Sequence, residues 1–286
     1  MSDDNKPTKN ALPYVLFDIG GTNSRVGVSF DGQTITGTEV FKTPKDFDAG
    51  VEAIDNAAKK LLLGTAAGLV AGGVAGPLTF DKSATVNAPH LPGWSGRPLK
   101  LELSTRFGCE VHLENDTAMA GLGEAAFGSG KEHKIVAYMT ISTGVNGVRI
   151  IDRKLETNSL GFEIGHQIID LDGTMRHADL ESLISGSALE RRYGDSAENI
   201  TNPAVWEEEA RVTAFGINNI IVFWAPDMVI LGGSLMKKMS IERVKMHVKN
   251  ILKLYPQLPI IVKSELGDLG GLWGALHYLN TVEKGK

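Results

Sequence analysis

The stretch Phe17-Asp18-Ile19-Gly20-Gly21-Thr22-Asn23 carries the strongest fold signal in this chain. The apolar run 14–19 predicts a short buried strand that ends in an acid. Two glycines follow, and they permit either a positive φ or a close approach of the backbone. Such a turn aims successive backbone N–H groups at one point, which makes an anion site, and Asp18 would hold Mg²⁺ directly or through water. The alternative is a plain hairpin turn in which Asp18 only caps the backbone.

Two further glycine turns follow the same pattern. Ser142–Gly147 lies between two predicted strands, and Gly232-Gly233-Ser234 lies between a strand and a predicted helix, whose N-terminus would face an anion. Each turn alone is a weak signal, but three in this order indicate a nucleotide held by backbone cradles. The sequence contains no Gly-x-x-x-x-Gly-Lys-Ser/Thr, so it is not a P-loop enzyme, and no Gly-x-Gly-x-x-Gly after a strand, which disfavours a dinucleotide-binding domain.

The hydrophobic periodicity around these turns predicts an α/β protein with two similar halves. Strands are expected at 14–19, 24–30, 34–41, 68–74, 135–142, 145–151, 228–231 and 259–262, and helices at 46–63, 117–127, 203–224, 235–254 and 269–279. An Asp-Gly turn at 31–32 joins the second and third strands, which suggests an antiparallel meander. Asn202 and Pro203 suit the start of the long helix. A simple doubly wound fold would alternate strand and helix from the beginning, and this chain does not.

Composition narrows the class of protein. The 286 residues are enough for two domains, the net charge is −5, and no long basic run is present, so a nucleic-acid partner is not expected. Cys109 is the single cysteine, so no intrachain disulfide and no cysteine-rich zinc site can form. The polar segment Met1–Ala11 is interpreted as a loose tail and not as a secretory signal. No membrane span is expected, and the cytoplasm is the default location.

Glu114-Asn115-Asp116 follows the apolar run Val111–Leu113 and precedes a predicted helix. Capping of that helix by Asn115 or Asp116 is one interpretation. The functional interpretation makes Asp116 a general base toward a hydroxyl, with Asn115 orienting the substrate.

Three other places carry candidate polar ligands. Asn87 lies in a stiff proline-rich loop that continues to Trp94, where it is either presented to a ligand or part of a surface loop anchored by Trp94. Glu163-Ile164-Gly165-His166 places an acid and an imidazole in a glycine-flanked turn, and Glu181 follows. Planar polar side chains of this kind bind sugar hydroxyls in pairs. The alternatives are a structural histidine and an ordinary acid on a helix surface.

Taken together, these pieces resemble the bacterial ROK family (repressors, open reading frames, kinases), and within it the glucokinase-type hexose kinases. The resemblance runs from about Tyr14 to the C-terminal helix. The matching pieces, in order, are Asp18–Thr22, Asn87-Ala88-Pro89, Leu91–Trp94, Glu114–Asp116, Gly123-Glu124, Thr143-Gly144, Glu163–His166, Glu181, Ser185-Gly186 and Gly232-Gly233.

The resemblance implies a two-domain actin-like ATPase fold, which is ribonuclease H-like, with a central cleft. It also implies transfer of the ATP γ-phosphoryl group to a sugar hydroxyl with Mg²⁺. The implied base is Asp116. The implied sugar ligands are Asn87, Asn115, Glu163, His166 and Glu181, and the implied nucleotide and metal residues are Asp18, Gly20, Gly21, Thr22, Asn23, Thr143, Gly144, Gly232, Gly233 and Ser234. Residues 1–117, completed by the helix 270–286, are expected as the first domain and 118–269 as a larger second one. A homodimer would fit the family.

The chain departs from the family pattern in two places. Most members hold a structural zinc with the histidine of the Glu-x-Gly-His turn and three cysteines that follow it. Here the stretch 170–180 contains no cysteine and is a few residues shorter, so no zinc of that type is expected. The second departure is at Val145, Asn146 and Val148, where the family usually has more glycine in the phosphate turn.

Three rival functions remain open on the sequence alone. The first is a kinase for another sugar, such as an N-acylhexosamine or fructose. The second is a non-catalytic sugar sensor like the family's repressors. Those carry a helix-turn-helix domain ahead of the kinase-like part, and the 17 residues before Asp18 are too few for one. The third is an actin-like or chaperone-like ATPase, which the clustered Asn, Glu and His residues disfavour.

Overall fold

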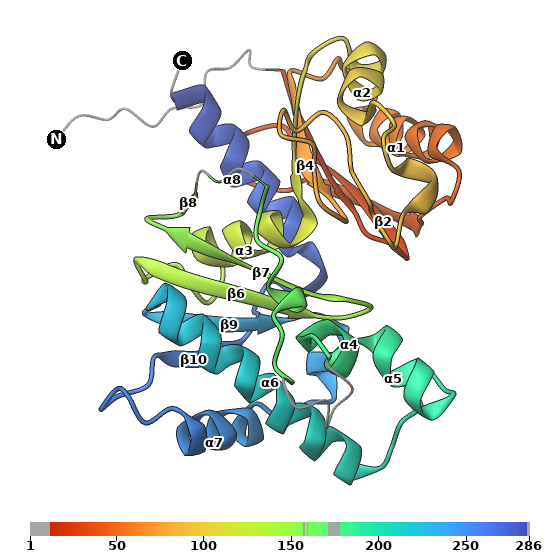
Figure 1. Cartoon of the computed structure of the whole chain (residues 1–286). Helices are drawn as coiled ribbons and strands as arrows, with labels where there is room; N and C mark the ends of the chain where they lie inside the picture. The colour runs from red at the N-terminus through yellow and green to blue at the C-terminus, as the bar shows by residue number, and fades with distance from the viewer. Residues whose placement is uncertain (1–11, 157, 159, 171–177, 285–286) are drawn as a thin grey trace, which may run out of the picture. The chain divides into compact units, whose positions relative to one another are not determined.

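The computed structural model describes residues 12–156, 158, 160–170 and 178–284. The chain divides into two compact units: unit 1 is Met1–Gly123, Asn158–Gly161 and Leu269–Lys286, and unit 2 is Glu124–Thr157 and Phe162–Asp268 (Figure 1). The expected N-terminal tail and residues 171–177 of the expected shortened loop lie outside the described residues.

Unit 1 contains a five-stranded mixed sheet in the order β3-β2-β1-β4-β5. The strands are β1 (Tyr14–Ile19), β2 (Asn23–Ser29), β3 (Gly37–Lys42), β4 (Leu69–Val74) and β5 (Glu110–Asn115). The first three form an antiparallel meander, and β4 and β5 continue the sheet parallel to β1. Ile19, Val74 and Asn115 pair in register, so the carboxyl ends of the three parallel strands meet at one edge.

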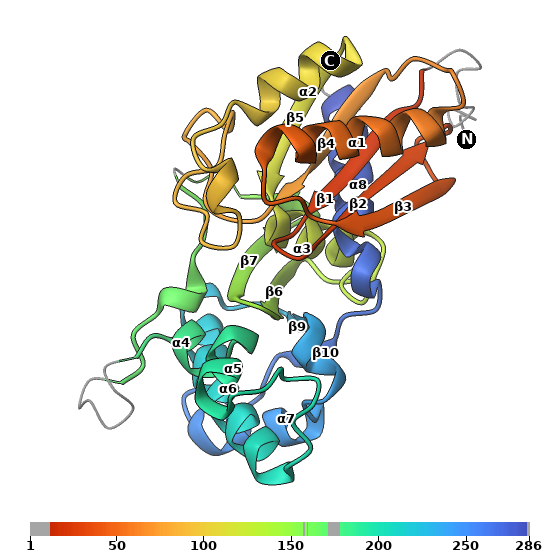
Figure 2. The ribbon, with the colours of Figure 1, turned by 90° about the vertical axis from the view of Figure 1, so that its right-hand side faces the viewer.

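Helices cover both faces of this sheet (Figure 2). One face packs a core against α1 (Phe47–Leu62), the short η1 (Pro92–Trp94) and α2 (Leu99–Phe107), and the other packs against α8 (Gly270–Lys284). Asp46 caps α1 by accepting a hydrogen bond from the Ala49 amide. A β-carbon at Gly123, on α3 (Asp116–Ala126), would overlap the backbone of α8, so glycine permits the close crossing of these helices.

Unit 2 repeats the same sheet topology. Its strand order is β10-β9-β6-β7-β8, with β6 (Ile135–Ile141), β7 (Val145–Ile151), β8 (Lys154–Leu155), β9 (Met228–Gly232) and β10 (Ile260–Lys263). The antiparallel strands β6, β7 and β8 correspond to β1, β2 and β3, and the parallel β9 and β10 correspond to β4 and β5. The helical elements are η2 (Ile164–His166), α4 (Leu180–Ile184), α5 (Gly186–Tyr193), α6 (Pro203–Trp224), η3 (Ser234–Lys237), α7 (Ile241–Ile251) and η4 (Gly267–Leu269).

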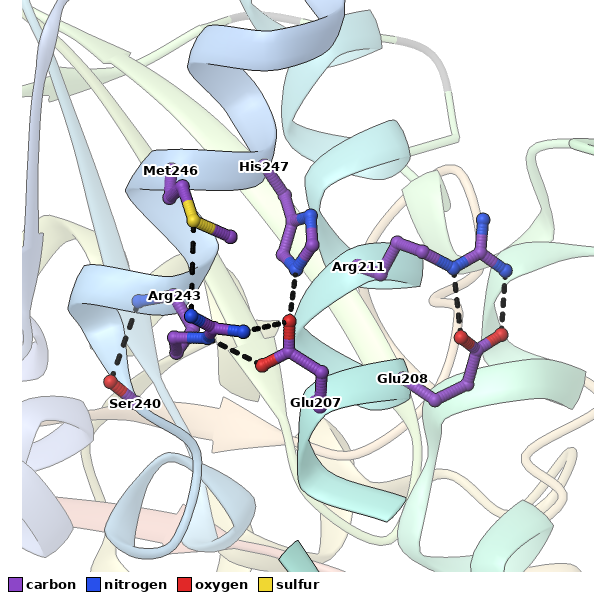
Figure 3. Close-up of polar contacts among 7 residues, drawn as sticks. All are labelled: Glu207, Glu208, Arg211, Ser240, Arg243, Met246 and His247. Atoms are coloured by element: carbon purple, nitrogen blue, oxygen red, sulfur yellow. Dashed lines mark hydrogen bonds and ion pairs between the residues drawn. The ribbon is translucent and has the colours of Figure 1, made fainter. Parts of the chain in front are cut away.

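Two helices of unit 2, α6 and α7, are joined by a charged contact on their surface (Figure 3). Glu207 on α6 accepts two hydrogen bonds from Arg243 of α7, each of 2.5 Å, and one of 2.8 Å from His247. These bonds, first of all that from Arg243, lower the pKa of Glu207 to about 2. Under the charged contact, α6 and α7 share an apolar core with β6 and β9.

Most predicted elements are confirmed within a residue or two, including the helix 203–224 with its Asn202 cap. The predicted helix 235–254 is wrong as a single element. Met239 is buried and Ser240 caps a new helix by accepting from the Arg243 amide, so the chain forms η3, a break and then α7. The predicted strand 34–41 begins later, at Gly37, because Asp31 accepts from the Gln33 and Thr34 amides and holds a wider turn. The helices α2, α4 and α5 were not predicted.

Within the described ranges, none of the helices combines the length and apolar content that crossing a bilayer requires.

Candidate active site

The first candidate turn lies at the carboxyl end of β1 and is exposed at Gly21 and Thr22. The Gly20 amide donates to the Asn23 carbonyl over 3.1 Å, so Asn23 closes the turn with its backbone. Neither Gly20 nor Gly21 has a positive φ, so of the two roles predicted for glycine here only close approach holds. A β-carbon on Gly21 would lie 2.6 Å from the β-carbon of His90.

Asp18 lies at the tip of β1, as predicted, with an ion pair to Arg25 on the neighbouring strand. The distance from Arg25 Nη1 to Asp18 Oδ2 is 3.4 Å, which is long for a hydrogen bond. A β-carbon on Gly271 of α8 would lie 3.1 Å from Oδ1 of Asp18, so glycine leaves room for this carboxylate. A partly buried carboxylate at a strand tip is the donor type that Mg²⁺ prefers.

Asp116 is the first residue of α3 and lies at the same sheet edge as the first turn. Asp116 directly follows β5, which is the second strand away from β1 in the sheet, so the two strand ends are about 10 Å apart. Its Oδ1 accepts from the Thr117 amide at 2.7 Å and from the Thr117 hydroxyl at 3.4 Å, and no bond to Oδ2 is found among the described residues. Burial raises the pKa of Asp116, against the hydrogen bonds from Thr117 and the charge of His90.

Asn115 caps α3, so the capping interpretation is correct for this residue. Its Oδ1 accepts from the Thr117 amide at 3.0 Å and the Ala118 amide at 3.3 Å, and its Nδ2 donates to the Gly76 carbonyl at 3.2 Å. These bonds fix the amide plane, and one N–H of Nδ2 remains beyond the bond to Gly76.

Asn87 is exposed in the proline-rich loop and adopts a left-handed backbone with φ of 48°. Such a conformation is strained in most residues and is tolerated by asparagine. The loop is anchored by Trp94, which is buried and donates from Nε1 to the Pro44 carbonyl at 3.0 Å. His90 in the same loop was missed by the sequence analysis, although it follows the Asn87-Ala88-Pro89 motif directly.

In unit 2, the turn 142–144 is the topological counterpart of the first turn, and it is bonded in addition to residues of two helices, α4 and α5. The carbonyl of Ser142 accepts from the Gly186 amide at 2.7 Å, and that of Thr143 accepts from the Ser187 amide and hydroxyl. The Val145 amide donates to Glu181 Oε2 at 2.8 Å. Glu181, expected as a sugar ligand, therefore also braces the turn expected to hold the nucleotide.

Glu163, His166 and Glu181 lie close together in unit 2. Gly165 makes this possible, because a β-carbon there would overlap the Val145 carbonyl and lie 3.3 Å from the β-carbon of Glu181. His166 Nδ1 lies 2.8 Å from Asp179 Oδ2. This bond first, and then the charges of Glu181, Asp179 and Glu163, raise the pKa of His166. Asp179 was also missed, although it stands two residues before Glu181.

Gly232 is the last residue of β9, beside the end of β6, and Gly233 and Ser234 follow it. Gly233 has φ of 92°, and a β-carbon there would overlap the backbone of Ile141. A β-carbon on Gly232 would overlap the hydroxyl of Tyr138. Both glycines thus have a packing reason. The helix that begins at Ser234 is η3, a four-residue 3-10 helix, and not the start of the single long helix that was predicted.

Across the residues that the structure describes, no group of three or more His, Cys, Asp and Glu side chains is arranged to hold a metal ion. The expectation of no zinc site rests on the single cysteine.

Comparison with known proteins identifies the fold and the family. The ROK hexokinase of Thermus thermophilus superimposes with a TM-score of 0.80 over 95% of this chain and 100% of that one, at 27% identity. A ROK family glucokinase from Streptomyces griseus, solved with glucose and AMPPNP, gives a TM-score of 0.78 over 92% and 98%, at 25% identity. The N-acetyl-D-glucosamine kinase of Escherichia coli O127:H6 is 28% identical over 92% of this chain and 97% of its own.

The fold is therefore the two-domain actin-like ATPase fold. The ROK family model matches residues 14–282, and the chain belongs to the ROK family.

Proposed function

We propose that this protein is an ATP-dependent hexose kinase with glucose as its acceptor. The observation that carries the proposal is the common sheet edge in unit 1, where the turn 20–22 with its exposed Gly21 and Thr22, Asp18 and the partly buried Asp116 lie at the ends of parallel strands. Ligands of α/β sheets bind at this edge. The ROK relatives named above, one of them solved with glucose and a nucleotide analogue, support the same reaction.

In this proposal, Asp116 Oδ2 accepts the proton of the sugar hydroxyl while that oxygen bonds to the γ-phosphorus and the bond to the β-phosphate oxygen breaks. ADP then leaves, and Asp116 returns its proton to water. The Thr117 amide and Asn115 hold the start of α3, so the carboxylate keeps its direction. Preorganised groups of this kind carry most of the catalysis in phosphoryl transfer.

The remaining expected residues take positioning roles. Asn87, Asn115, Glu163, His166 and Glu181 would bind sugar hydroxyls, and the turns 20–23, 143–144 and 232–234 would hold the nucleotide through their backbones. The Asp18 carboxylate has the chemistry to hold Mg²⁺, directly or through water, and the bound ion would neutralise charge on the phosphates. Val145 and Asn146 stand where the family has more glycine, and the Val145 amide already donates to Glu181, so we expect weaker contact with the nucleotide at the second turn.

The proposal includes the expected domains, residues 1–117 with 270–286 and residues 118–269, a cytoplasmic location, and a homodimer. N-Acetylglucosamine is a second candidate acceptor, because the curated relative at 28% identity is named as its kinase.

The test is an ADP-release assay with ATP and Mg²⁺ against glucose, N-acetylglucosamine, N-acetylmannosamine and fructose, on wild type and Asp116→Asn. Asparagine keeps an oxygen for the Thr117 amide but cannot take a proton, so we expect turnover to fall roughly 10²–10⁴-fold with sugar binding retained. Because the base must be ionised, wild-type kcat/KM should rise with pH through the raised pKa of Asp116.

Glu110→Gln is the matched control, since this acid is exposed at the far end of the same strand. Its turnover should stay within about twofold, as is usual for a surface residue away from the chemistry. Near-normal turnover in Asp116→Asn would show that Asp116 is not the general base. Absence of ADP release with every sugar, from folded wild type, would favour a sugar sensor.

A further inference from the structure

Asp179 is the hydrogen-bond partner of His166, at 2.8 Å between Oδ2 and Nδ1. Burial acts to raise the pKa of Asp179, but the bonds from His166 and Ser182 outweigh it and lower that pKa. The side chain is therefore a carboxylate at neutral pH and can only accept hydrogen bonds. It follows that Nδ1 of His166 carries the proton, and that the neutral ring has its lone pair on Nε2.

Asp179 is itself held from several directions. Its Oδ1 accepts from the Ser182 amide at 2.8 Å and caps α4, and its own carbonyl accepts from the Ser182 hydroxyl. The backbone of Asp179 pairs with Ile168, and the Leu180 amide donates to the Gln167 carbonyl. The carboxylate therefore joins the η2 turn to the start of α4.

The other nitrogen of His166 faces a different environment. Within the described part of the chain, Nε2 makes no hydrogen bond, and 59% of the side chain is exposed. Glu181 lies near enough to act on the charge of the ring, and it is fixed through the Val145 amide. The imidazole is thus fixed through Nδ1, and Nε2 is available to accept a hydrogen bond from a ligand.

We propose that Asp179 is a positioning residue for sugar binding, which sets the ring direction and the proton position of His166 so that Nε2 meets a sugar hydroxyl. This rests on the proposed function. A metal-bound histidine is commonly oriented through contacts around it, and here a carboxylate at a helix start orients the histidine without a metal. Asp179 touches no substrate and acts through His166.

Two variants separate the contact with His166 from the helix cap. Serine and asparagine both serve well at an N-cap, so Asp179→Ser keeps the cap but is too short to reach His166. Asp179→Asn keeps the cap and the size, but its amide can donate to Nδ1 and reverse the tautomer. We expect KM for the sugar to rise roughly 10–100-fold in Asp179→Ser, with kcat and KM for ATP within about threefold, as for loss of an orienting partner.

The spectroscopic measurement is the ¹⁵N shift of the imidazole nitrogens in histidine-labelled protein, with the His166→Ala spectrum assigning His166 among the seven histidines. We expect a protonated Nδ1 in wild type and a protonated Nε2 in Asp179→Asn. In a His166→Ala background, Asp179→Ser should add no further rise in KM for the sugar. Asp46→Ser, at a cap without a histidine partner, is the control and should leave KM unchanged.

The outcomes separate the two proposals. An unchanged sugar KM in Asp179→Ser, with active wild type, overturns the role of Asp179 alone. An equal loss in kcat and both KM values also overturns it, because that pattern reports a structural defect. If wild type shows no sugar-dependent ADP release, the proposed function fails and the sugar role fails with it. The ¹⁵N measurement still decides whether Asp179 sets the tautomer of His166, and a protonated Nε2 in wild type would refute that.

Discussion

The hairpin turns 20–22 and 142–144 occupy the same place in two sheets of the same topology, yet they are held differently. The first is closed by its own backbone and by Thr43, whose hydroxyl donates to the Gly20 carbonyl, and Gly21 and Thr22 remain exposed. The second is also closed by its own backbone, because the Ser142 amide donates to the Gly144 carbonyl over 2.8 Å. It is held in addition by the Gly186 and Ser187 amides of α5 and by Glu181 of α4.

The difference comes from the segment that each unit places after its antiparallel strands. After β8, unit 2 continues through η2, α4 and α5, whereas unit 1 goes from β3 directly into α1. The added segment carries His166, Asp179 and Glu181. A repeated sheet thus supplies two equivalent turns, and the inserted helices turn one of them into part of a side-chain site.

The largest effect expected from this comparison is at Gly233, which packs against β6 beside the second turn. Alanine there would be strained at φ of 92° and would overlap the backbone of Ile141, so we expect a loss of about 4 kcal/mol in unfolding free energy. Gly267→Ala is the control, because Gly267 also has a positive φ, of 52°, but no atom lies near its added β-carbon. Its unfolding free energy should fall by only about 1 kcal/mol. Urea unfolding measures both, and equal losses would contradict the packing argument.

The second prediction concerns a buried acid found in unit 2. Burial raises the pKa of Glu209 to about 7 from 4.5, against its ion pair with Arg192. The folded state therefore binds the proton more tightly, so stability should fall as pH rises from about 4.5 to about 7 and level off above that. A shift of about 2.5 units corresponds to a loss of order 3 kcal/mol.

Glu209→Gln should remove this pH dependence in urea unfolding measured at several pH values. In unit 1, the buried Asp55 pairs with two cations, Lys59 at 2.7 Å and Arg106 at 3.7 Å, whereas among the described residues Glu209 pairs with Arg192 alone. Glu208→Gln is the control, because bonds from Arg211 lower the pKa of Glu208 and place its titration below the window. A slope that survives in Glu209→Gln would show that another group causes it.

The smallest effect expected is at the open turn of unit 1. A methyl group on Gly21 would press on His90, so the turn or the Asn87 loop must shift. A displacement of about 1 Å at a reacting site can lower the reaction rate on the order of 10²-fold. We therefore expect kcat/KM for ATP to fall by about that factor in Gly21→Ala. Gly270→Ala is the control. Its added β-carbon would lie 3.5 Å from the Ala120 carbonyl oxygen, which is an ordinary van der Waals contact, so the kinetic constants should stay unchanged. Unaltered kinetics in Gly21→Ala would mean that this turn does not hold the nucleotide.

Sequence patterns found most strands of both sheets, though not the short β8, because strand periodicity and glycine turns are local. They failed at residues 235–254, where apolar spacing continues through a break that Ser240 imposes by capping a new helix. For Gly20 and Gly21 they left positive φ and close approach open, and only the structure decides for close approach, since the contact of Gly21 is with a loop some seventy residues away.

The sequence by itself determined the family, the two similar halves, the candidate base Asp116 and the absence of a three-cysteine zinc site, because these depend on residue identity and order. Only the tertiary structure decided that Asn115 caps α3, that Glu181 braces the second turn, and that Asp179 holds His166. Each of these bonds joins groups whose direction depends on local folding, and the bonds of Glu181 and Asp179 span residues 36 and 13 positions apart. Spacing along the chain does not encode such directions.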